Sequence, residues 1–570
     1  MPNLNILDGT GAGRSSNVNA SHTINLYPEI GTDPAGKAQI TLVSTPGCNL
    51  WVLIGTGPIR GQRPFAGLLF VVSGGFLYSV TSTGIVTQLG ALTTSTGRVS
   101  MIDNGVQSAG IGGNQIMVVD GVQGYVYNIV TGAFTVVTSP GFPATPRHLA
   151  YQDGYGILTD GDMVVRASDQ YDLTSWQAVA QTPVQFLPDT VQSVVGMPQG
   201  LVLVKQSNTE FYYDAGTPTS IGFPFTRLQG AVIPYGTMSP WSLILTGGTA
   251  AWLAWQQTDS GPVFIGPVLL NGYSIQPIAP QAIVYQMSLW TDVANVFGWS
   301  YAEGGHIFAA WTSPGDNQTL VFDLTTNKWH DRSTSTDGQY VIGRHVCNAY
   351  ARFNNRHLVG DYLSGNIYQM ADCFNTDFGL PIPRVRIAGN IFDRQSLSRL
   401  FISQFQIDLE TGVRNPGPTV PAAATAALSG DGVGSVTVTS PGYDFVTAPQ
   451  IVFVPVDGNG GGAAGTATIA NGQIVGITVT TTGAGYTAPP QVIIVDPGLS
   501  DNPIISIAWS KDGGHTFGNE RVKPLGTVGQ YKTRVLWQKQ GAARDRVLQV
   551  RCVSNSTRIV LIGGYAEVEE

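Results

Sequence analysis

The carboxylates are the side chains that could support hydrolysis in this sequence. A glycosidase needs two carboxyl groups flanking the bond that it breaks, about 5 to 9 Å apart. Asp153, Asp160, Asp162 and Glu303 are candidates, but most acidic residues stand in turn contexts such as Asp160-Gly161-Asp162. An Asp in a turn usually accepts hydrogen bonds from backbone N–H groups. The pattern favours turns over catalysis, so we expect no catalytic residue and no enzyme.

Histidines and cysteines between residues 345 and 373 offer a possible zinc site. His345, Cys347, His357 and Cys373 carry suitable ligand atoms, but their spacing matches neither a CxxC nor an HxxxH ligand pair. We therefore expect a structural role for these side chains, with no bound metal and no cofactor. The wide spacing of the four cysteines shows no disulfide framework and favours folding in a reducing compartment.

A turn motif with a recognisable hydrogen-bonding pattern lies near the C-terminus. Ser510, Asp512, Gly514 and Thr516 match the Asp-box, a hairpin motif common in sialidase-like propellers. The Ser and Asp side chains of such a motif satisfy backbone donors at a tight turn. We therefore expect the Asp-box to be a feature of the fold without a catalytic role.

One cluster of basic residues follows this motif. It comprises Lys532, Arg534, Lys539, Arg544, Arg546 and Arg551. The pattern is compatible with a solvated face and, equally, with a contact surface for assembly. An Arg guanidinium binds carboxylates through two parallel hydrogen bonds, which suits an acidic patch on another ring protein or on the next subunit. We take Lys532, Arg534, Lys539, Arg544 and Arg546 as candidate assembly contacts, with direct DNA contact as the lesser alternative.

The charge of the chain is low for its length. Charged residues make up 12% of the 570 residues, against a typical value of about 25%. A large protein with so few charges is expected to have much of its surface covered by partners. The net charge of -8 argues against a surface that binds duplex DNA, but it is compatible with a channel through which DNA slides. No apolar run approaches the ~18 residues of a membrane-spanning helix, so we expect no membrane insertion.

Short apolar or alternating segments, bounded by Gly, Asp, Asn and Ser, dominate the first two thirds of the chain. Segments such as 68–72 and 115–119 predict β-strands. Residues 125–137 and 320–329 share one pattern: a strand, a Thr/Gly/Asn corner and a second strand opened by an aromatic residue. Such units at spacings of about 40 to 50 residues are typical of propeller blades. We predict an all-β protein with a β-propeller of six blades.

The composition changes near Thr411-Gly412 and stays rich in Ala, Gly, Thr, Val and Pro to about Asn502. Residues 433–454 and 475–495 each contain a strand, a Gly-Tyr turn and a second strand marked by Pro. Alternating Val and Thr residues favour a folded segment over a linker. The repeat predicts a small duplicated β module, inserted into a domain whose parts lie on both sides of it.

The N-terminal segment is polar and Gly-rich. It has no apolar stretch typical of a signal peptide. The run Gly9-Thr10-Gly11-Ala12-Gly13-Arg14 lacks the Lys-Ser/Thr of a phosphate-binding loop. We expect an extended arm that could lie on a neighbouring subunit.

Several motifs occur in the order found in one family of phage proteins. The early ones include Asn25-Leu26-Tyr27-Pro28-Glu29, Gly57-Pro58-Ile59-Arg60-Gly61 and Gly74-Gly75-Phe76-Leu77-Tyr78. The strongest are C-terminal: residues 510–520, from Ser510-Lys511-Asp512-Gly513-Gly514 onward, and Tyr531-Lys532-Thr533-Arg534-Val535-Leu536-Trp537. The ordered set resembles the tail-nozzle, or packaged-DNA stabilisation, proteins of short-tailed (podovirus-type) bacteriophages. The resemblance covers residues 1–411 and 503–570 and leaves out residues 412–502.

This resemblance implies a structural virion tail protein that is made in the host bacterial cytoplasm. It implies a hexameric ring below the portal and adaptor rings, which extends the DNA channel, retains packaged DNA and docks tail fibres or spikes. DNA would pass through the channel without sequence-specific binding. It also implies a β-sandwich-like platform formed by both chain ends. The expected division is an N-terminal arm and platform part at 1–45, the propeller at 46–378, platform parts at 379–411 and 503–570, and the inserted module at 412–502.

A second function is open at this point: a propeller-type glycan-binding or glycan-hydrolysing tail component. The Asp-box and the aromatic-rich loops motivate it. Turnover of host polysaccharide by the isolated chain would favour this alternative over a structural role.

Overall fold

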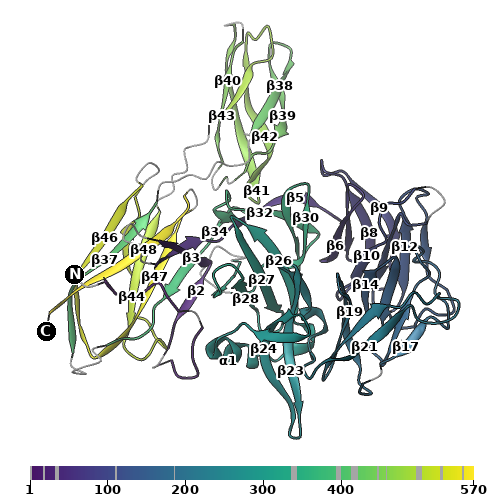
Figure 1. Ribbon diagram of the computed structural model, residues 1–570. Helices are drawn as coiled ribbons and strands as arrows, with labels where there is room; N and C mark the ends of the chain where they lie inside the picture. The colour runs from purple at the N-terminus through teal and green to yellow at the C-terminus, as the bar shows by residue number, and fades with distance from the viewer. Residues whose placement is uncertain are drawn as a thin grey trace. The chain divides into compact units, whose positions relative to one another are not determined.

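The chain folds almost entirely into β-strands (Figure 1), which confirms the predicted all-β class. The computed structural model describes residues 3–569 except 5, 10, 17–18, 33–37, 109–111, 185, 335–342, 393–398, 412–421, 444, 446–447, 457–458, 496–502, 527–530 and 555–556. This described part contains one α-helix, α1 (Gln281–Ser288), and two 3-10 helices, η1 (Pro240–Ser242) and η2 (Val293–Asn295).

The chain divides into two compact units. Unit 1 holds Met1–Leu50, His330–Gly343 and Gln369–Glu570, and unit 2 holds Trp51–Trp329 and Arg344–Tyr368. Both chain ends therefore belong to one unit, as the predicted platform requires. The predicted domain boundaries stay predictions, and the borders of the insertion at 412 and 502 lie outside the described residues.

Unit 2 is built from four-stranded antiparallel sheets. The first three are β6 (Ile59–Phe65), β7 (Leu68–Ser73), β8 (Phe76–Val80), β9 (Val86–Ala91); β10 (Ser100–Asp103), β11 (Gln115–Val119), β12 (Gly124–Asn128), β13 (Phe134–Val136); and β14 (His148–Gln152), β15 (Tyr155–Thr159), β16 (Val164–Ala167), β17 (Gln181–Pro183). The next two are β18 (Val191–Met197), β19 (Gly200–Lys205), β20 (Thr209–Asp214), β21 (Phe225–Ile233); and β22 (Ile244–Thr246), β23 (Thr249–Thr258), β24 (Gly261–Asn271), β25 (Ser274–Pro277).

Two further groups of four strands, each part of a larger sheet, complete the set. One contains β26 (Phe297–Glu303), β27 (His306–Ser313), β28 (Gln318–Asp323) and β29 (Lys328–Asp331). The other contains β30 (Cys347–Phe353), β31 (Arg356–Asp361), β32 (Asn366–Ala371) and, as its fourth strand, β5 (Gly47–Leu53). The described residues thus form seven blades, and the prediction of six was wrong. The count failed because the seventh blade takes β5 from a distant part of the sequence.

The first strands of the blades form a closed ring. Strand β6 contacts β10, β10 contacts β14, β14 contacts β18, β22 contacts β26, β26 contacts β30, and β30 contacts β6; η1 contacts both β18 and β26.

Apolar clusters between blades stabilise this ring. Where the first and last blades meet, Ile59 and Leu69 pack in one buried cluster with Ala351, Leu358 and Ile367. Each fully buried Ile or Leu side chain of this cluster contributes about 1.5 to 3 kcal/mol.

The seventh blade is closed by a tight backbone approach. The N–H of Ile54, just after β5, donates to the carbonyl of Gly365, just before β32, at 2.7 Å. A Cβ atom at Gly365 would lie 2.1 Å from the Ile54 carbonyl oxygen. Glycine is therefore required at residue 365, because any side chain would separate the two segments.

The corners predicted in residues 125–137 and 320–329 are hairpin turns. Asn128 ends β12, and its Oδ1 accepts hydrogen bonds from the N–H groups of Val130 and Thr131 at 2.9 and 3.0 Å. Asp323 ends β28 and accepts from the N–H of Thr325 at 2.9 Å. A short polar side chain that satisfies the next backbone donors turns the chain without a helix. The predicted unit of strand, corner and strand is confirmed.

Unit 1 contains a sandwich of two sheets. One has the order β3 (Leu26–Thr32), β4 (Ala38–Ser44), β48 (Val560–Glu569), β37 (Leu400–Glu410), β46 (Thr533–Ala543), with β1 (Asn3–Leu4) on β48. The other includes β2 (His22–Ile24), β35 (Arg384–Ile387), β47 (Asp545–Val553), β44 (Ile504–Ser510), β45 (Arg521–Pro524), with β36 (Ile391–Phe392) on β47. Leu42 and Ile407 of the first sheet share a buried core with Ile507 and Val550 of the second. Strands β33 (Thr376–Asp377) and β34 (Leu380–Pro381) form a short hairpin.

Residues Ile6 to Gly9 of the N-terminal arm pack on their own chain, and the expected contact of the arm with a neighbouring subunit stays a prediction. Ile6 and Leu7 belong to the sandwich core. Arg386, which is fully buried in β35, donates to the carbonyl of Ile6 at 2.6 Å and to those of Asp8 and Gly9 at 2.5 Å. Burial lowers the pKa of this guanidinium to about 10. The arm is therefore held by a single internal cation that binds its backbone.

The duplicated module forms one six-stranded sheet within unit 1, seen at the top of Figure 1. The first copy is β38 (Ala423–Ser429), β39 (Gly432–Ser440), β40 (Gln450–Val454), and the second is β41 (Gly461–Ala470), β42 (Gln473–Ala484), β43 (Gln491–Val495). The strand order is β39-β38-β43-β40-β41-β42, so the third strand of each copy pairs with the first strand of the other. Neither copy can complete its sheet alone, which explains in physical terms why the repeat occurs as a pair.

A buried carboxyl group makes the stability of unit 1 depend on pH. Asp377 in β33 accepts a hydrogen bond from the Cys48 N–H at 3.1 Å. Burial raises the pKa of this carboxyl to about 7, although the charges of Arg332 and Arg384 act in the opposite direction. An unfolded Asp titrates near 3.9, so the folded chain binds the extra proton between about pH 4 and pH 7.

We expect the free energy of unfolding to fall as the pH rises through this window, by up to about 4 kcal/mol from this group. Urea unfolding of the wild type and of Asp377→Asn at pH 5 and pH 8 measures the effect. The Asn side chain keeps an acceptor for Cys48 and cannot ionise, so the variant should lose this part of the pH dependence. Equal changes between the two pH values in both proteins would contradict the assignment.

Candidate functional site

The predicted basic cluster does not form one patch. Lys532, Arg534, Lys539 and Arg544 are exposed. Arg534 approaches Asp408 of the neighbouring strand β37 at 3.6 Å, as an ion pair in which the Arg side chain is largely exposed. Arg534 and Arg544 stand near opposite ends of β46, about 30 Å apart at the usual rise per strand residue. The candidates therefore divide into a pair at 532 and 534 and a pair at 539 and 544.

Arg546 was predicted to be an assembly contact at the surface, but it lies inside the fold. It is 3% exposed, and its guanidinium donates to the carbonyls of Gln540, Gly541 and Leu400 at 3.3, 2.9 and 3.4 Å. It also packs over the Trp509 ring at 5.0 Å. Arg546 thereby holds the end of the β46–β47 hairpin against β37. The contact role of the four exposed residues stays a prediction.

The Asp-box forms the turn between β44 and β45. The Ser510 hydroxyl donates to Asp512 at 2.6 Å and accepts from the Gly514 N–H at 2.9 Å. The Asp512 carboxylate accepts from the N–H and the hydroxyl of Thr516 at 2.9 and 2.5 Å. These hydrogen bonds hold the pKa of Asp512 far below its usual range. The side chains of Ser510, Asp512 and Thr516 serve the turn, as the sequence predicts.

Three of the four carboxylates considered for hydrolysis accept hydrogen bonds from residues nearby in the sequence: Asp153 from the Gln152 side chain at 3.0 Å, Asp162 from the Met163 N–H at 2.9 Å, and Asp160. Asp160 accepts from the Asp162 N–H at 3.1 Å and pairs with Arg166 at 2.5 Å. Asp153 lies in a turn with a positive φ of 50°. Within the described residues, no group of three or more His, Cys, Asp or Glu side chains could hold a metal ion. His345 instead stacks on Trp299, with ring centroids 5.5 Å apart.

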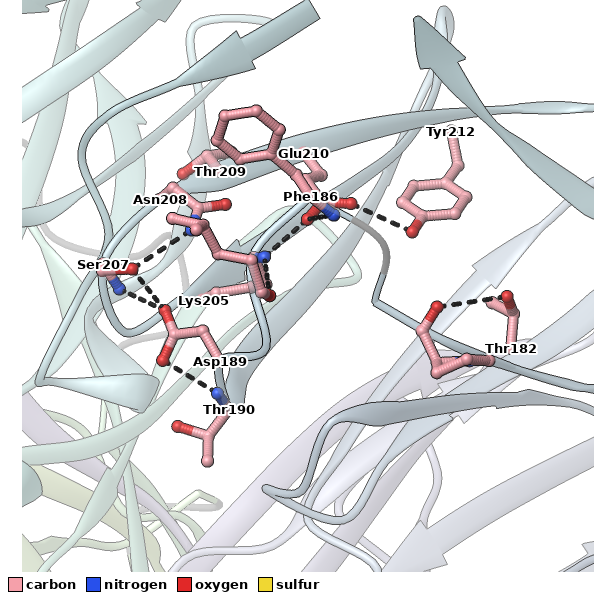
Figure 2. Close-up of polar contacts among 12 residues, drawn as sticks. Thr182, Phe186, Asp189, Thr190, Lys205, Ser207, Asn208, Thr209, Glu210 and Tyr212 are labelled. Carbon is pink, nitrogen blue, oxygen red and sulfur yellow. Dashed lines mark hydrogen bonds and ion pairs between the residues drawn. The ribbon is translucent and has the colours of Figure 1, made fainter.

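A buried ion pair that the sequence did not reveal lies in the fourth blade (Figure 2). Lys205 ends β19 and Glu210 follows the turn into β20; both side chains are fully buried, and Nζ lies 2.5 Å from Oε1. Tyr212 donates to Oε2 of Glu210 at 3.1 Å. Burial and the Glu210 carboxylate raise the pKa of the Tyr212 hydroxyl. Charged residues beside a turn normally face solvent, so no pattern in the sequence marked this pair.

The ion pair fixes the connection between the third and fourth blades. Lys205 Nζ donates to the Leu187 carbonyl at 3.0 Å, and Glu210 accepts from the Phe186 N–H at 3.3 Å (Figure 2). Asp189 completes the anchor by accepting from the N–H and the hydroxyl of Ser207, both at 2.7 Å. The loop consequently presents Phe186 and Leu187, which are 50% and 44% exposed, from a fixed backbone.

No helix in the described part of the chain is long and apolar enough to cross a membrane. Most of the ionisable groups described above are engaged in turns, hairpins or loop anchors. The arrangement offers hydrogen-bonded turns and anchored loops.

Several solved structures have a low similarity to this chain. The extracellular domain of the putative hybrid two component system BT4673 from B. thetaiotaomicron has 11% identity and a TM-score of 0.37, covering 74% of this chain and 51% of that chain. The chain thus spans about half the length of that structure. The Neurospora crassa Pan2 WD40 domain has 12% identity and a TM-score of 0.33, covering 55% and 89%. YCF48 bound to D1 peptide has 13% identity and a TM-score of 0.33, covering 57% and 99%. None of the curated proteins matches the chain.

Two family models match the chain in the order of its domains. The model described as bacteriophage P22 Gp10, beta-propeller, matches residues 2–374. The model described as bacteriophage P22 Gp10, beta-sandwich, matches residues 481–569. The first match alone covers more than half of the chain and contains all seven blades. This protein therefore belongs to the family of bacteriophage P22 Gp10, the tail-associated DNA-stabilisation proteins of podoviruses.

Proposed function

We propose that this chain forms the nozzle of a short phage tail. Six copies assemble as a ring below the portal and adaptor, extend the DNA channel, retain the packaged genome and dock tail fibres or spikes. The chain acts without catalysis and resides in the tail of the virion. The observation that carries the proposal is the match of both parts of one structural phage family, propeller and sandwich, in a single chain.

The physical character of the surface supports this role. With 12% charged residues, the chain has little charge to keep copies apart. Strand β45 is an edge of its sheet, and all four of its residues are exposed. An edge strand presents unpaired backbone groups to which another chain can add, and the charged Arg521 and Lys523 limit indiscriminate pairing. The net charge of -8 suits a channel that DNA traverses without adhering.

Reconstitution tests the proposal directly. The full chain is mixed with the portal–adaptor complex of its own phage, and the products are weighed by native mass spectrometry and imaged by electron microscopy. We expect a complex with six added copies that continue the axial channel. A chain that stays separate from the complex at micromolar concentration would contradict the nozzle role.

A charge reversal tests the exposed basic pair as an assembly contact. In the variant Lys532→Glu/Arg534→Glu, an acidic surface on the adaptor or the next copy would meet a like charge. We expect the affinity for the portal–adaptor complex to fall by about tenfold or more, with an unchanged melting temperature. Arg399→Glu/Lys511→Glu is the matched control, because it reverses two exposed charges of the same unit away from residues 532 and 534. Equal losses in both variants would indicate a general charge effect and remove the contact from residues 532 and 534.

A further inference from the structure

The inserted module contacts other parts of unit 1 through one end of its sheet, which we call the base of the module. The base consists of the turn between β41 and β42 and of the segment that follows β39. The N–H of Phe445 donates to the carbonyl of Gly472 at 3.0 Å. The N–H of Ile474 donates to the carbonyl of Pro441, also at 3.0 Å. These hydrogen bonds join the two segments into one base, of which the proposed nozzle role makes no use.

The base lies on two neighbouring segments of unit 1, β5 and the residues around β33. Gln473 donates from Nε2 to the carbonyl of Leu50 in β5 at 2.7 Å. The ring of Tyr443 packs on the ring of Phe374, two residues before β33, with centroids 5.4 Å apart. All four residues belong to unit 1. The base therefore covers both members of one strand pair.

Two glycines bring the backbone of the base against the β33–β34 hairpin. A Cβ atom at Gly379 would lie 2.9 Å from the Gly472 nitrogen, so a side chain there would separate the two segments. A Cβ atom at Gly472 would lie 3.4 Å from Oδ1 of Asn49, a fully buried residue of β5. The corresponding turn of the first copy of the repeat ends in Asp431. The two copies thus differ at the residue that this contact requires to be small.

Strand β5 has two neighbours in the sheet order β30-β31-β32-β5-β33-β34. On one side it completes the seventh blade by pairing with β32. On the other side Cys48 stands opposite Asp377 of β33, and the Phe378 N–H donates to the Cys48 carbonyl at 2.8 Å. Strand β33 has only two residues, so it forms few hydrogen bonds with β5. The module base reinforces the side of β5 that a short strand covers.

We propose that the inserted module is a clamp that holds β5 in the sheet of the seventh blade. Its base binds β5 through Gln473 and packs on the segment around β33 through Tyr443 and Gly472. Neither strand can leave the pair without breaking its contact with the module. Strand β5 lies about three hundred residues from the other strands of its blade, and ordering so distant a segment carries an entropy cost that the clamp offsets.

Hydrogen exchange of the full chain, followed by mass spectrometry, tests the clamp. In the variant Tyr443→Ala/Gln473→Ala the base loses its ring contact and its side-chain hydrogen bond to Leu50, and neither residue belongs to the buried core of the module. We expect the amides of β5 and of residues 374–380 to exchange about tenfold faster, because the strand pair opens more often. The amides of β41 and β42 should keep their wild-type exchange rates.

The variant Thr425→Ala/Gln491→Ala is the control. These two residues pair across β38 and β43, where both are exposed, so the variant truncates polar side chains of the same module outside its base. The exchange of β5 should then be unchanged. The proposal would be overturned by wild-type exchange of β5 in Tyr443→Ala/Gln473→Ala, by equal acceleration in both variants, or by faster exchange confined to the module. This readout uses the chain by itself and is independent of its binding to the portal–adaptor complex.

Discussion

Replacing Lys205 by methionine will lower the free energy of unfolding of the chain by about 3 to 5 kcal/mol. The reason is that Glu210 would remain as a fully buried carboxylate without its cation 2.5 Å away. The Leu187 carbonyl would also lose its donor. Urea unfolding followed by tryptophan fluorescence measures this loss. Loop 186–190 should become sensitive to protease, because Lys205 and Glu210 anchor its backbone.

The double variant Lys205→Met/Glu210→Leu is the control for this prediction. Removing both charges abolishes the uncompensated carboxylate, and replacing a buried ion pair by apolar side chains is often neutral. We expect the double variant to regain most of the stability that the single variant loses. The loop should nevertheless stay sensitive to protease, since neither new side chain can bind the Leu187 carbonyl or the Phe186 N–H. A double variant that loses as much stability as Lys205→Met, or more, would show that the uncompensated Glu210 carboxylate is not the cause of the loss.

The second large effect is expected at Arg386. Changing it to methionine should cost about 3 kcal/mol or more, because the carbonyls of Ile6, Asp8 and Gly9 would lose their charged donor in a buried environment. The arm should detach from the sandwich, and residues before His22 should become accessible to protease. Chemical denaturation combined with mass analysis of the fragments gives both readouts.

Arg551→Met provides the comparison for Arg386. Arg551 stands on the adjacent strand β47 and pairs with Glu520 at 2.7 Å, where the carboxylate is one-third exposed. Ion pairs near the surface usually contribute about 0 to 1 kcal/mol. We therefore expect little change and an intact arm. An Arg386→Met protein as stable as Arg551→Met would show that the arm is held by Ile6 and Leu7 packing alone.

Local chemistry accounts for the parts of the fold that could be predicted from the sequence. Asn128, Asp323 and Asp512 mark turns because their side chains bond to donors within four residues, and such contacts do not depend on distant parts of the chain. The paired repeat of the inserted module could also be recognised in the sequence, because each copy has the same local order of strand, Gly-Tyr turn and strand. The number of blades could not be predicted from the sequence. Strand β5 joins a sheet whose other strands follow about three hundred residues later.

Burial of charged residues is the part that sequence reasoning missed. Lys205 and Glu210 flank a turn and have the character of solvent-exposed residues, yet both are inside a blade. Arg546 carried a usable signal: it lies in phase with Leu548, Val550 and Cys552 on β47, and those three face the sandwich core. Side chains alternate between the two faces of a strand. Once the strand is assigned, this alternation therefore predicts that Arg546 is buried, in contrast to Arg534 and Arg544.

The place of β5 in the last blade has a consequence for synthesis on the ribosome. Residues 47–53 leave the ribosome early, whereas the strand that they pair with, β32, is translated about three hundred residues later. At about 5 to 20 residues per second, the early segment waits roughly 15 to 60 seconds with an open hydrogen-bonding edge. During this interval six blades can form, but the ring stays open, and the nascent chain is most exposed to wrong pairing with another copy. Biogenesis of this protein is therefore expected to depend on shielding of its first strands until translation has passed residue 371.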